Sequence, residues 1–236
     1  MLLMQSDCIM NRHGVNQVRR GQDANVQPLD SATASTAPDR DVAAFDERAA
    51  GYESGRLGQW HLEIADRTAA RALACQRAPR RVLDVGCGTG YLLRRLAAQV
   101  PDAGARFVGV DLAPRMLQVA AERAGDPRLR FARAAAERLP AADATFDLVV
   151  TTTSFDHWAD QGAGLAECAR VLAPGGTLVL TDLFSALLWP TLRGDRREKA
   201  RTRGRATALL AAAGLTDIEW HRCYGLIIAT ATATRR

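Results

Sequence analysis

Apolar positions recur on two different periods along this chain of 236 residues. From residue 81 onward, short runs rich in Val, Leu and Phe alternate with longer stretches in which apolar residues stand three or four positions apart. The first kind of run is typical of buried strands and the second of amphipathic helices. Strands are expected at 82–85, 107–111, 129–132, 146–150 and 177–181, and helices at 91–99, 114–123 and 161–172.

This alternation predicts an α/β fold, because strands linked by helices form a parallel sheet with helices on both faces. A helix at 200–213, ended by Gly214, precedes two more apolar runs at 216–221 and 226–232. The gap between these last runs is too short for a parallel crossover, so they are expected to form an antiparallel hairpin. The expected fold is a doubly wound, mostly parallel seven-stranded sheet with an antiparallel last strand.

The residues before the sheet divide into a tail and a helical cap. Residues 1–38 are polar, small and without periodicity, which is typical of a flexible tail. A first helix is expected to begin at Asp39 or Asp41, giving a cap over 39–78 of a single domain at 39–236. The expected apolar faces of the two cap helices are Val42, Phe45, Ala49 and Tyr52, then Leu57, Trp60 and Ile64.

The segment 183–199, between the fifth strand and the last helix, is too apolar for a simple loop. It is expected to form part of a lid over the substrate, together with the cap helices that carry Tyr52 and Trp60. Its apolar residues are Phe184, Leu187, Leu188, Trp189 and Pro190.

Composition narrows the class of protein. Hydrophobic residues make up 47% and charged residues 24% of the chain, as in ordinary globular domains. No apolar run approaches the roughly 18 residues of a membrane span, and the first residues lack the features of a signal peptide. The five cysteines are scattered and odd in number, which is typical of reduced thiols. A cytoplasmic location without a membrane partner is therefore expected.

The net charge of +5 is concentrated in the segment 193–205, which holds seven basic and two acidic residues. Such a segment can bind nucleic acid, an anionic membrane or an acidic substrate. No aromatic residues lie among these charges, as a surface that stacks bases would require. A solvent-exposed helix face is therefore the favoured interpretation, and a nucleic-acid partner is the alternative.

The most informative motif is D-x-G-x-G-x-G at 84–90, directly after a Val/Leu strand. Glycines at a strand-to-helix turn let the backbone approach a ligand closely. Asp111 stands 21 residues after Gly90, at the end of the next strand, where a carboxylate can hold a ribose diol. The dinucleotide spacing G-x-G-x-x-G would need a third glycine at Tyr91 or Leu93, so a nicotinamide cofactor is disfavoured. These residues predict an adenosine-type cofactor.

The motif at 84–90 resembles the first motif of class I S-adenosylmethionine-dependent methyltransferases. Three further segments resemble that family: 146–150 its fourth strand, 172–178 its L-x-P-G-G turn, and 45–52 its F-D-x-x-A-x-x-Y segment. The resemblance runs from about residue 42 to the end of the chain. It implies a Rossmann-like methyltransferase fold, S-adenosylmethionine as cofactor, and methyl transfer to a small-molecule acceptor, mainly by proximity and alignment.

The resemblance also implies which residues bind the cofactor. The turn 86–88 would present backbone to the methionine part, with Asp84 near its ammonium. Asp111 would accept hydrogen bonds from both ribose hydroxyls, and Leu112 and Met116 would enclose the adenine. A purely structural role is the alternative for Asp84, and ordinary helix core is the alternative for Met116. The complete implied set is Tyr52, Asp84, Gly86, Cys87, Gly88, Asp111, Leu112, Met116, Ala135, Ala136, Glu137 and Thr152.

One loop departs from the family pattern. The family's loop after the third strand reads G-D-A-E-x-L-P, and its Asp meets the adenine amino group, whereas Ala135 stands at that position here. Backbone groups near Ala136 would then hold the base, and Glu137 is the side chain that could compensate. We expect weaker or less adenine-selective binding rather than loss of the cofactor.

The loop 151–158 is similar to a family segment that often carries two adjacent histidines. Asp156 replaces the first histidine and His157 keeps the second. An imidazole here could take a proton from a hydroxyl or acid acceptor, which makes His157 the candidate catalytic residue. The favoured alternative is that His157 only packs beside the pocket, because many members of the family work by proximity alone.

Other chemistries find little support in the sequence. It contains no P-loop, no G-x-S-x-G motif and no metal-ligand spacing among its four histidines. Two alternatives to a small-molecule methyltransferase remain. One is a nucleic-acid methyltransferase that uses the basic segment 193–205. The other is a non-catalytic methyltransferase-like binding protein, which the departures at Ala135 and Asp156 would favour.

Overall fold

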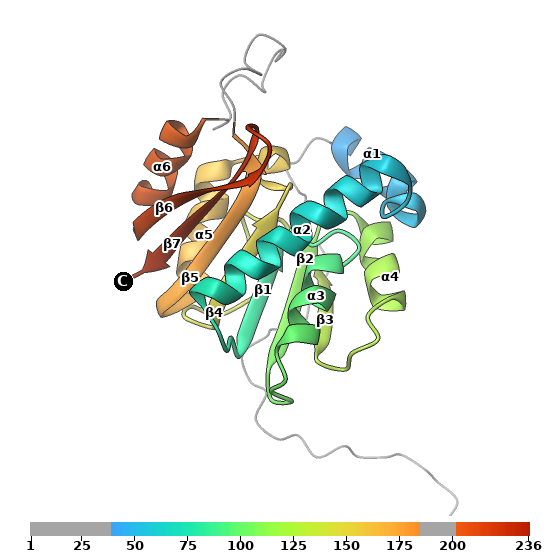
Figure 1. Cartoon of the computed structure of the whole chain (residues 1–236), viewed down its shortest axis with the longest axis horizontal. Coiled ribbons are helices and arrows are strands. Elements are labelled where there is room, and N and C mark those ends of the chain that lie inside the picture. The colour runs from blue at the N-terminus through green and yellow to red at the C-terminus, as the bar shows by residue number, and fades with distance from the viewer. Residues whose placement is uncertain (1–38, 185–201) are drawn as a thin grey trace, which may run out of the picture.

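The computed structural model describes residues 39–184 and 202–236, and a seven-stranded sheet runs through the centre of the fold (Figure 1). The strands are β1 (Arg81–Val85), β2 (Arg106–Asp111), β3 (Leu129–Arg133), β4 (Phe146–Thr152), β5 (Leu172–Leu183), β6 (Leu215–Tyr224) and β7 (Ile228–Arg235). Their order across the sheet is β3-β2-β1-β4-β5-β7-β6. β7 pairs antiparallel with β5 and β6, and the other pairs are parallel. The predicted α/β fold and its terminal antiparallel hairpin are confirmed.

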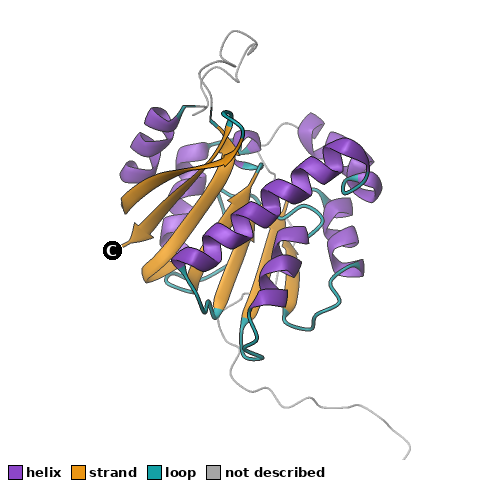
Figure 2. Cartoon of the chain, viewed as in Figure 1, coloured by secondary structure: helices purple, strands orange, loops and turns teal. Residues whose placement is uncertain are grey.

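Helices cover both faces of this sheet, giving three layers (Figure 2). The helices are α1 (Asp39–Arg48), α2 (Gly55–Cys75), α3 (Tyr91–Gln99), α4 (Pro114–Glu122), α5 (Gln161–Val171) and α6 (Arg203–Ala212), with single 3-10 turns η1 (Ala49–Gly51) and η2 (Phe155–His157). Two core clusters result: α2 and α3 belong to one, α5 and α6 to the other. Along β4, Leu148 and Val150 join the first cluster and Val149 the second, because successive side chains of a strand point to opposite faces.

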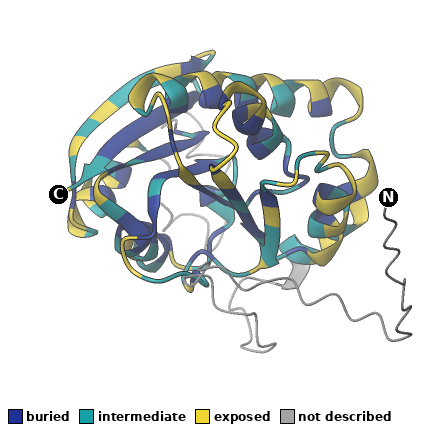
Figure 3. Ribbon diagram, turned by 90° about the horizontal axis from the view of Figure 1, so that it is seen from below, coloured by how far each residue is buried: buried dark blue, intermediate teal, exposed yellow. Residues whose placement is uncertain are grey.

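The central strands are buried on both faces (Figure 3). Parallel strands covered by helices on each side read as nearly continuous apolar runs, which is why 82–85 and 146–150 could be recognised from the sequence. Strand order reverses between β1 and β4, so a crevice is expected there at the carboxyl ends of the strands. The glycine motif follows β1 directly and therefore lies at this crevice.

The N-terminal cap, formed by α1, η1 and α2, lies beside that crevice. Its first helix packs against α4, where Ala49 and Met116 are buried in one small apolar cluster. The Asp46 carboxylate accepts a hydrogen bond from the backbone N–H of Arg115 at 2.9 Å, which satisfies one of the free donors at the start of α4. The expected apolar face of the second helix is partly wrong: Ile64 is buried, but Leu57 is 61% exposed.

Several boundaries differ from the expected ones for local reasons. β5 begins at Leu172 rather than at 177, because Phe146 pairs with Leu172 before the register shifts. The hairpin turn lies at 225–227, since Tyr224 still pairs with Ile228. The expected tail at 1–38, positions 185–199 of the expected lid and positions 193–201 of the basic segment lie outside the described residues.

Candidate active site

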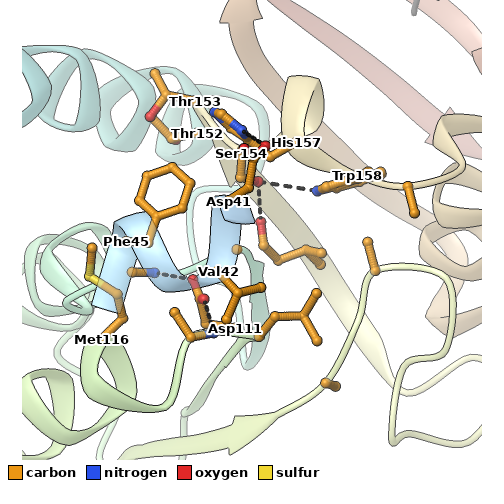
Figure 4. Close-up of a pocket in the computed structure, with 18 of the residues that line it drawn as sticks. Asp41, Val42, Phe45, Asp111, Met116, Thr152, Thr153, Ser154, His157 and Trp158 are labelled. Carbon is orange, nitrogen blue, oxygen red and sulfur yellow. Dashed lines mark hydrogen bonds and ion pairs between the residues drawn. The ribbon is translucent and has the colours of Figure 1, made fainter. Parts of the chain in front are cut away.

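A pocket of about 760 Å³, partly open to solvent, lies at the carboxyl ends of β1, β2 and β4, beside α1. Figure 4 shows Asp41, Val42 and Phe45 of α1 on one side of the pocket, and Asp111 with Met116 on the wall that β2 and α4 form. Of the residues predicted from the sequence, Tyr52, Gly86, Gly88, Asp111, Leu112, Met116, Ala136, Glu137, Thr152 and His157 line it.

The glycine turn needs its glycines for two different reasons. Gly86 has φ +75°, and a Cβ there would lie 2.3 Å from the Ser154 hydroxyl oxygen. Gly88 has φ +51° but faces open space, which leaves its backbone accessible to a ligand. The N–H groups of Gly86 and Cys87 both donate to the carbonyl of Val110, at 2.8 and 2.9 Å. What this turn can offer a ligand is therefore carbonyl oxygens and a close Cα surface rather than free N–H donors.

Asp111 is held rigidly at the end of β2. One carboxylate oxygen accepts from the N–H of Gly88 at 2.8 Å and the other from the N–H of Ala113 at 2.9 Å. Burial raises the pKa of this carboxyl, partly offset by these hydrogen bonds. Each oxygen keeps a further lone pair, and the carboxylate lines the pocket. Two acceptor atoms fixed side by side suit a pair of neighbouring hydroxyl groups.

Leu112 and the buried Met116 form an apolar wall next to Asp111, and Ala136 and Glu137, from the loop after β3, also line the pocket. The Glu137 carboxylate accepts from the N–H of Asp160 at 2.9 Å, so the fold already uses one of its oxygens. An apolar wall of this kind can pack against the face of a purine base.

Three predicted residues do not line the pocket: Asp84, Cys87 and Ala135. Asp84 is buried in β1 behind the turn, where burial and the nearby Asp111 carboxylate raise its pKa to about 8. Cys87 is also buried, and its sulfur lies 2.7 Å from where a Cβ on Gly109 would stand. Their side chains support the turn from within the protein.

Ser154 was not predicted as a site residue, although its side chain connects β1 and β4, the two strands on either side of the crevice. Its hydroxyl donates to the Val85 carbonyl at 2.9 Å and lies 2.8 Å from the Thr151 hydroxyl and 3.3 Å from the indole nitrogen of Trp158. These contacts fix the loop after β4. The neighbouring Thr152 hydroxyl lines the pocket, is buried, and has no hydrogen-bond partner among the described residues.

His157 lies at the end of η2 and contacts the cap. Its Nδ1 is 3.1 Å from a carboxylate oxygen of Asp41, and its ring meets Phe45 edge-on at 5.0 Å between centroids. Both partners belong to α1, and Asp41 lies 116 positions before His157 in the chain. In the sequence, Asp41 carries only the signal of a helix start, so its pairing with His157 could not be predicted from it.

More polar groups lie around the same end of the pocket. Asp182, at the end of β5, is buried and accepts from the N–H groups of Asp156 and Leu183, at 3.3 and 2.6 Å. Burial raises its pKa to about 6. The Tyr52 hydroxyl is 3.4 Å from Nδ1 of His61, and burial raises the pKa of this phenol. Tyr52 lines the pocket, whereas Asp182 and His61 do not.

In the described ranges, no group of three or more His, Cys, Asp or Glu side chains is arranged to hold a metal ion. Within the same ranges, no helix combines the length and apolar character needed to cross a bilayer.

Comparisons with known proteins agree with this geometry. Residues 83–180 match the model of a methyltransferase domain family. The chain is 35% identical over 190 residues to the malonyl-(acyl-carrier protein) O-methyltransferase of Geobacter sulfurreducens, covering 75% of this chain and 70% of that protein. It is 46% identical over 118 residues to the demethylmenaquinone methyltransferase of Deinococcus radiodurans, covering 49% of this chain and 48% of that protein. The match thus spans about half the length of the Deinococcus relative.

Two solved structures share the fold. An S-adenosylmethionine-dependent methyltransferase from Aquifex aeolicus superposes with a TM-score of 0.63 at 19% identity, over 82% of this chain and 97% of that one. A second such methyltransferase, from Mesorhizobium loti, superposes with a TM-score of 0.62 at 20% identity, over 72% of this chain and 98% of that one. The chain therefore belongs to the family of S-adenosylmethionine-dependent methyltransferases.

Proposed function

We propose that this protein binds S-adenosylmethionine and transfers its methyl group to a small-molecule acceptor. The observation that carries the proposal is that Asp111 and the turn 86–88 meet at one pocket. This pocket lies at the carboxyl ends of the strands, next to the point where strand order reverses. The residues fit such a cofactor. Asp111 offers two fixed acceptors for a ribose diol, Leu112 and Met116 an apolar surface for the base, and Thr152 an unpartnered buried hydroxyl.

The protein's part in the reaction is chiefly alignment. When bound, the cofactor supplies a methyl group already activated by a positively charged sulfur. Holding two reactants in reactive geometry can contribute on the order of 7–11 kcal/mol to lowering a barrier. The cap supports this role, since Val42 and Phe45 of α1 line the pocket. The apolar lining of the pocket by Val42, Phe45 and Leu112 suits a small acceptor better than a nucleic acid.

Thermal stabilisation by S-adenosylhomocysteine tests the proposal. At 100 times its Kd a ligand adds about 2.7 kcal/mol to the free energy of unfolding, which should raise the Tm of a chain this long by about 5–10 °C. NAD is the control ligand and is expected to leave the Tm unchanged, because the glycine spacing is not that of a dinucleotide site. A shift with NAD but not with S-adenosylhomocysteine would contradict the proposal.

We further propose that His157 accepts a proton from the acceptor, with Asp41 holding its Nδ1. His157→Ala is expected to lower kcat by about 100-fold, the usual size of a general-base contribution, while leaving the Kd of S-adenosylhomocysteine unchanged. The measurement uses the acceptor that a turnover screen identifies, across a range of pH. A kcat equal to that of the wild type at every pH would show that alignment alone suffices.

A further inference from the structure

One cluster of charged side chains joins the cap to the glycine turn. Glu53 lies between η1 and α2, next to the pocket residue Tyr52, and its side chain is only 18% exposed. A single oxygen of this carboxylate faces the Thr89 hydroxyl at 2.6 Å, a guanidinium nitrogen of Arg94 at 2.8 Å and one of Arg123 at 3.1 Å. We call Glu53, Thr89, Arg94 and Arg123 the Glu53 cluster.

The partners of Glu53 come from three elements around the pocket. Thr89 stands between Gly88 and Gly90 in the turn itself, Arg94 in α3, and Arg123 directly after α4. Arg94 also donates to the backbone carbonyl of Thr89 at 2.6 Å. Thr89 is thus held at its hydroxyl by Glu53 and at its carbonyl by the arginine that Glu53 binds. The acid fixes the conformation of a turn whose glycines have positive φ.

The backbone of Glu53 is fixed from the other side. At Gly58, in the first turn of α2, a Cβ would lie 2.4 Å from the carbonyl carbon of Glu53, so this helix packs directly on the Glu53 peptide. Arg123 in addition donates to the carbonyl of Ala50 at 3.3 Å. The Glu53 peptide thus packs against the cap helix, while its carboxylate contacts the turn.

The Glu53 cluster depends on the negative charge of the Glu53 carboxylate. Burial alone would raise the pKa of Glu53, but the hydrogen bonds from Thr89 and Arg94 and the two arginine charges outweigh it and lower the pKa. The carboxylate is thus ionised near neutral pH. Hydrogen bonds to an ionised group are about twice as strong as neutral ones, so a neutral amide of the same shape would hold the turn less firmly.

We propose that Glu53 is a positioning residue for the cofactor, coupling the cap to the conformation of the glycine turn. This inference rests on the proposed function, because it concerns the same pocket. Glu53 itself does not line the pocket and acts through Thr89, whose neighbour Gly88 donates to Asp111. It follows that a change in the cap should alter cofactor affinity.

Isothermal titration with S-adenosylhomocysteine tests the inference on the full chain. Glu53→Gln is expected to raise the Kd at least about 10-fold, the effect of losing a charge-assisted hydrogen bond. Glu63→Gln is the matched control, because Glu63 lies in α2 and pairs with the exposed Arg67 at 2.6 Å, away from the glycine turn. The control is expected to bind like the wild type.

Thr89→Val provides a milder variant, which keeps the ion pairs and removes only the hydrogen bond to the turn. It is expected to weaken binding severalfold, and the double variant should bind no worse than Glu53→Gln alone, since both changes break one connection. If Glu53→Gln does not fold, the Kd of Thr89→Val still tests the inference. A lower Tm with an unchanged Kd in both single variants would overturn the inference. Absence of binding by the wild type would instead overturn the proposed function.

Discussion

Replacing Asp111 with asparagine is expected to weaken binding of S-adenosylhomocysteine by about 100-fold, corresponding to ~3 kcal/mol. The carboxylate accepts two backbone hydrogen bonds and presents its remaining lone pairs to the pocket. Hydrogen bonds to a charged group contribute about 1.5–3 kcal/mol each. The amide removes the charge and replaces one acceptor oxygen with a donor, while keeping the shape of the side chain. Isothermal titration measures the change directly.

Asp143→Asn is the control for this experiment. Its carboxylate pairs with Arg170 at 2.8 Å, is 73% exposed, and lies just before β4, at the opposite end of the strands from the pocket. It is expected to bind the ligand like the wild type, because exposed ion pairs contribute little even to stability. Equal affinity of Asp111→Asn and the wild type would mean that the ribose is not held here.

Stability should depend on pH through Asp84. Burial and the Asp111 carboxylate raise the pKa of Asp84 to about 8, against about 3.9 in an unfolded chain. Between these values the folded protein keeps a proton that the unfolded chain has released, so stability falls as pH rises, by up to about 1.4 kcal/mol per pH unit. From pH 6 to pH 8, the free energy of unfolding of the wild type is expected to fall by about 2 kcal/mol more than that of Asp84→Asn.

Urea unfolding at several pH values measures this difference. Asparagine resembles a protonated aspartic acid in shape, so the variant should fold and lack only the titration. Asp182, whose pKa burial raises to about 6, is present in both proteins, so its own titration cancels in the comparison. Parallel stability curves for the two proteins would mean that Asp84 is ionised in the folded state at neutral pH.

The sheet could be predicted almost completely from the sequence. Runs such as 82–85 and 146–150 are short, apolar and separated by periodic helices, and both properties are local. The antiparallel hairpin followed from the few residues between its strands. The errors in the predicted sheet concerned only where strands begin and end, as at Leu172 and 225–227. There, pairing with a neighbouring strand decides how far a strand continues.

The candidate site was predicted where its residues are fixed by position along a strand. The turn 86–88 and Asp111 follow the ends of neighbouring strands, so any parallel pairing of β1 with β2 brings them together. The same reasoning could not tell that Asp84 and Cys87 lie behind the turn, because the side of a strand that a residue faces depends on what packs there. Ser154 was missed since its role consists of contacts to Val85 and Trp158.

The sequence by itself determined the sheet, the glycine turn and the place of the pocket, because these depend on local periodicity and on short spacings. Only the tertiary structure decided how the cap is joined to them. Asp41 meets His157 and Glu53 meets Thr89 across 116 and 36 positions of chain. Such pairs depend on the angle at which α1 packs on α4 and α2 on the sheet. That angle is set by the sum of many apolar contacts, which no short stretch of sequence contains.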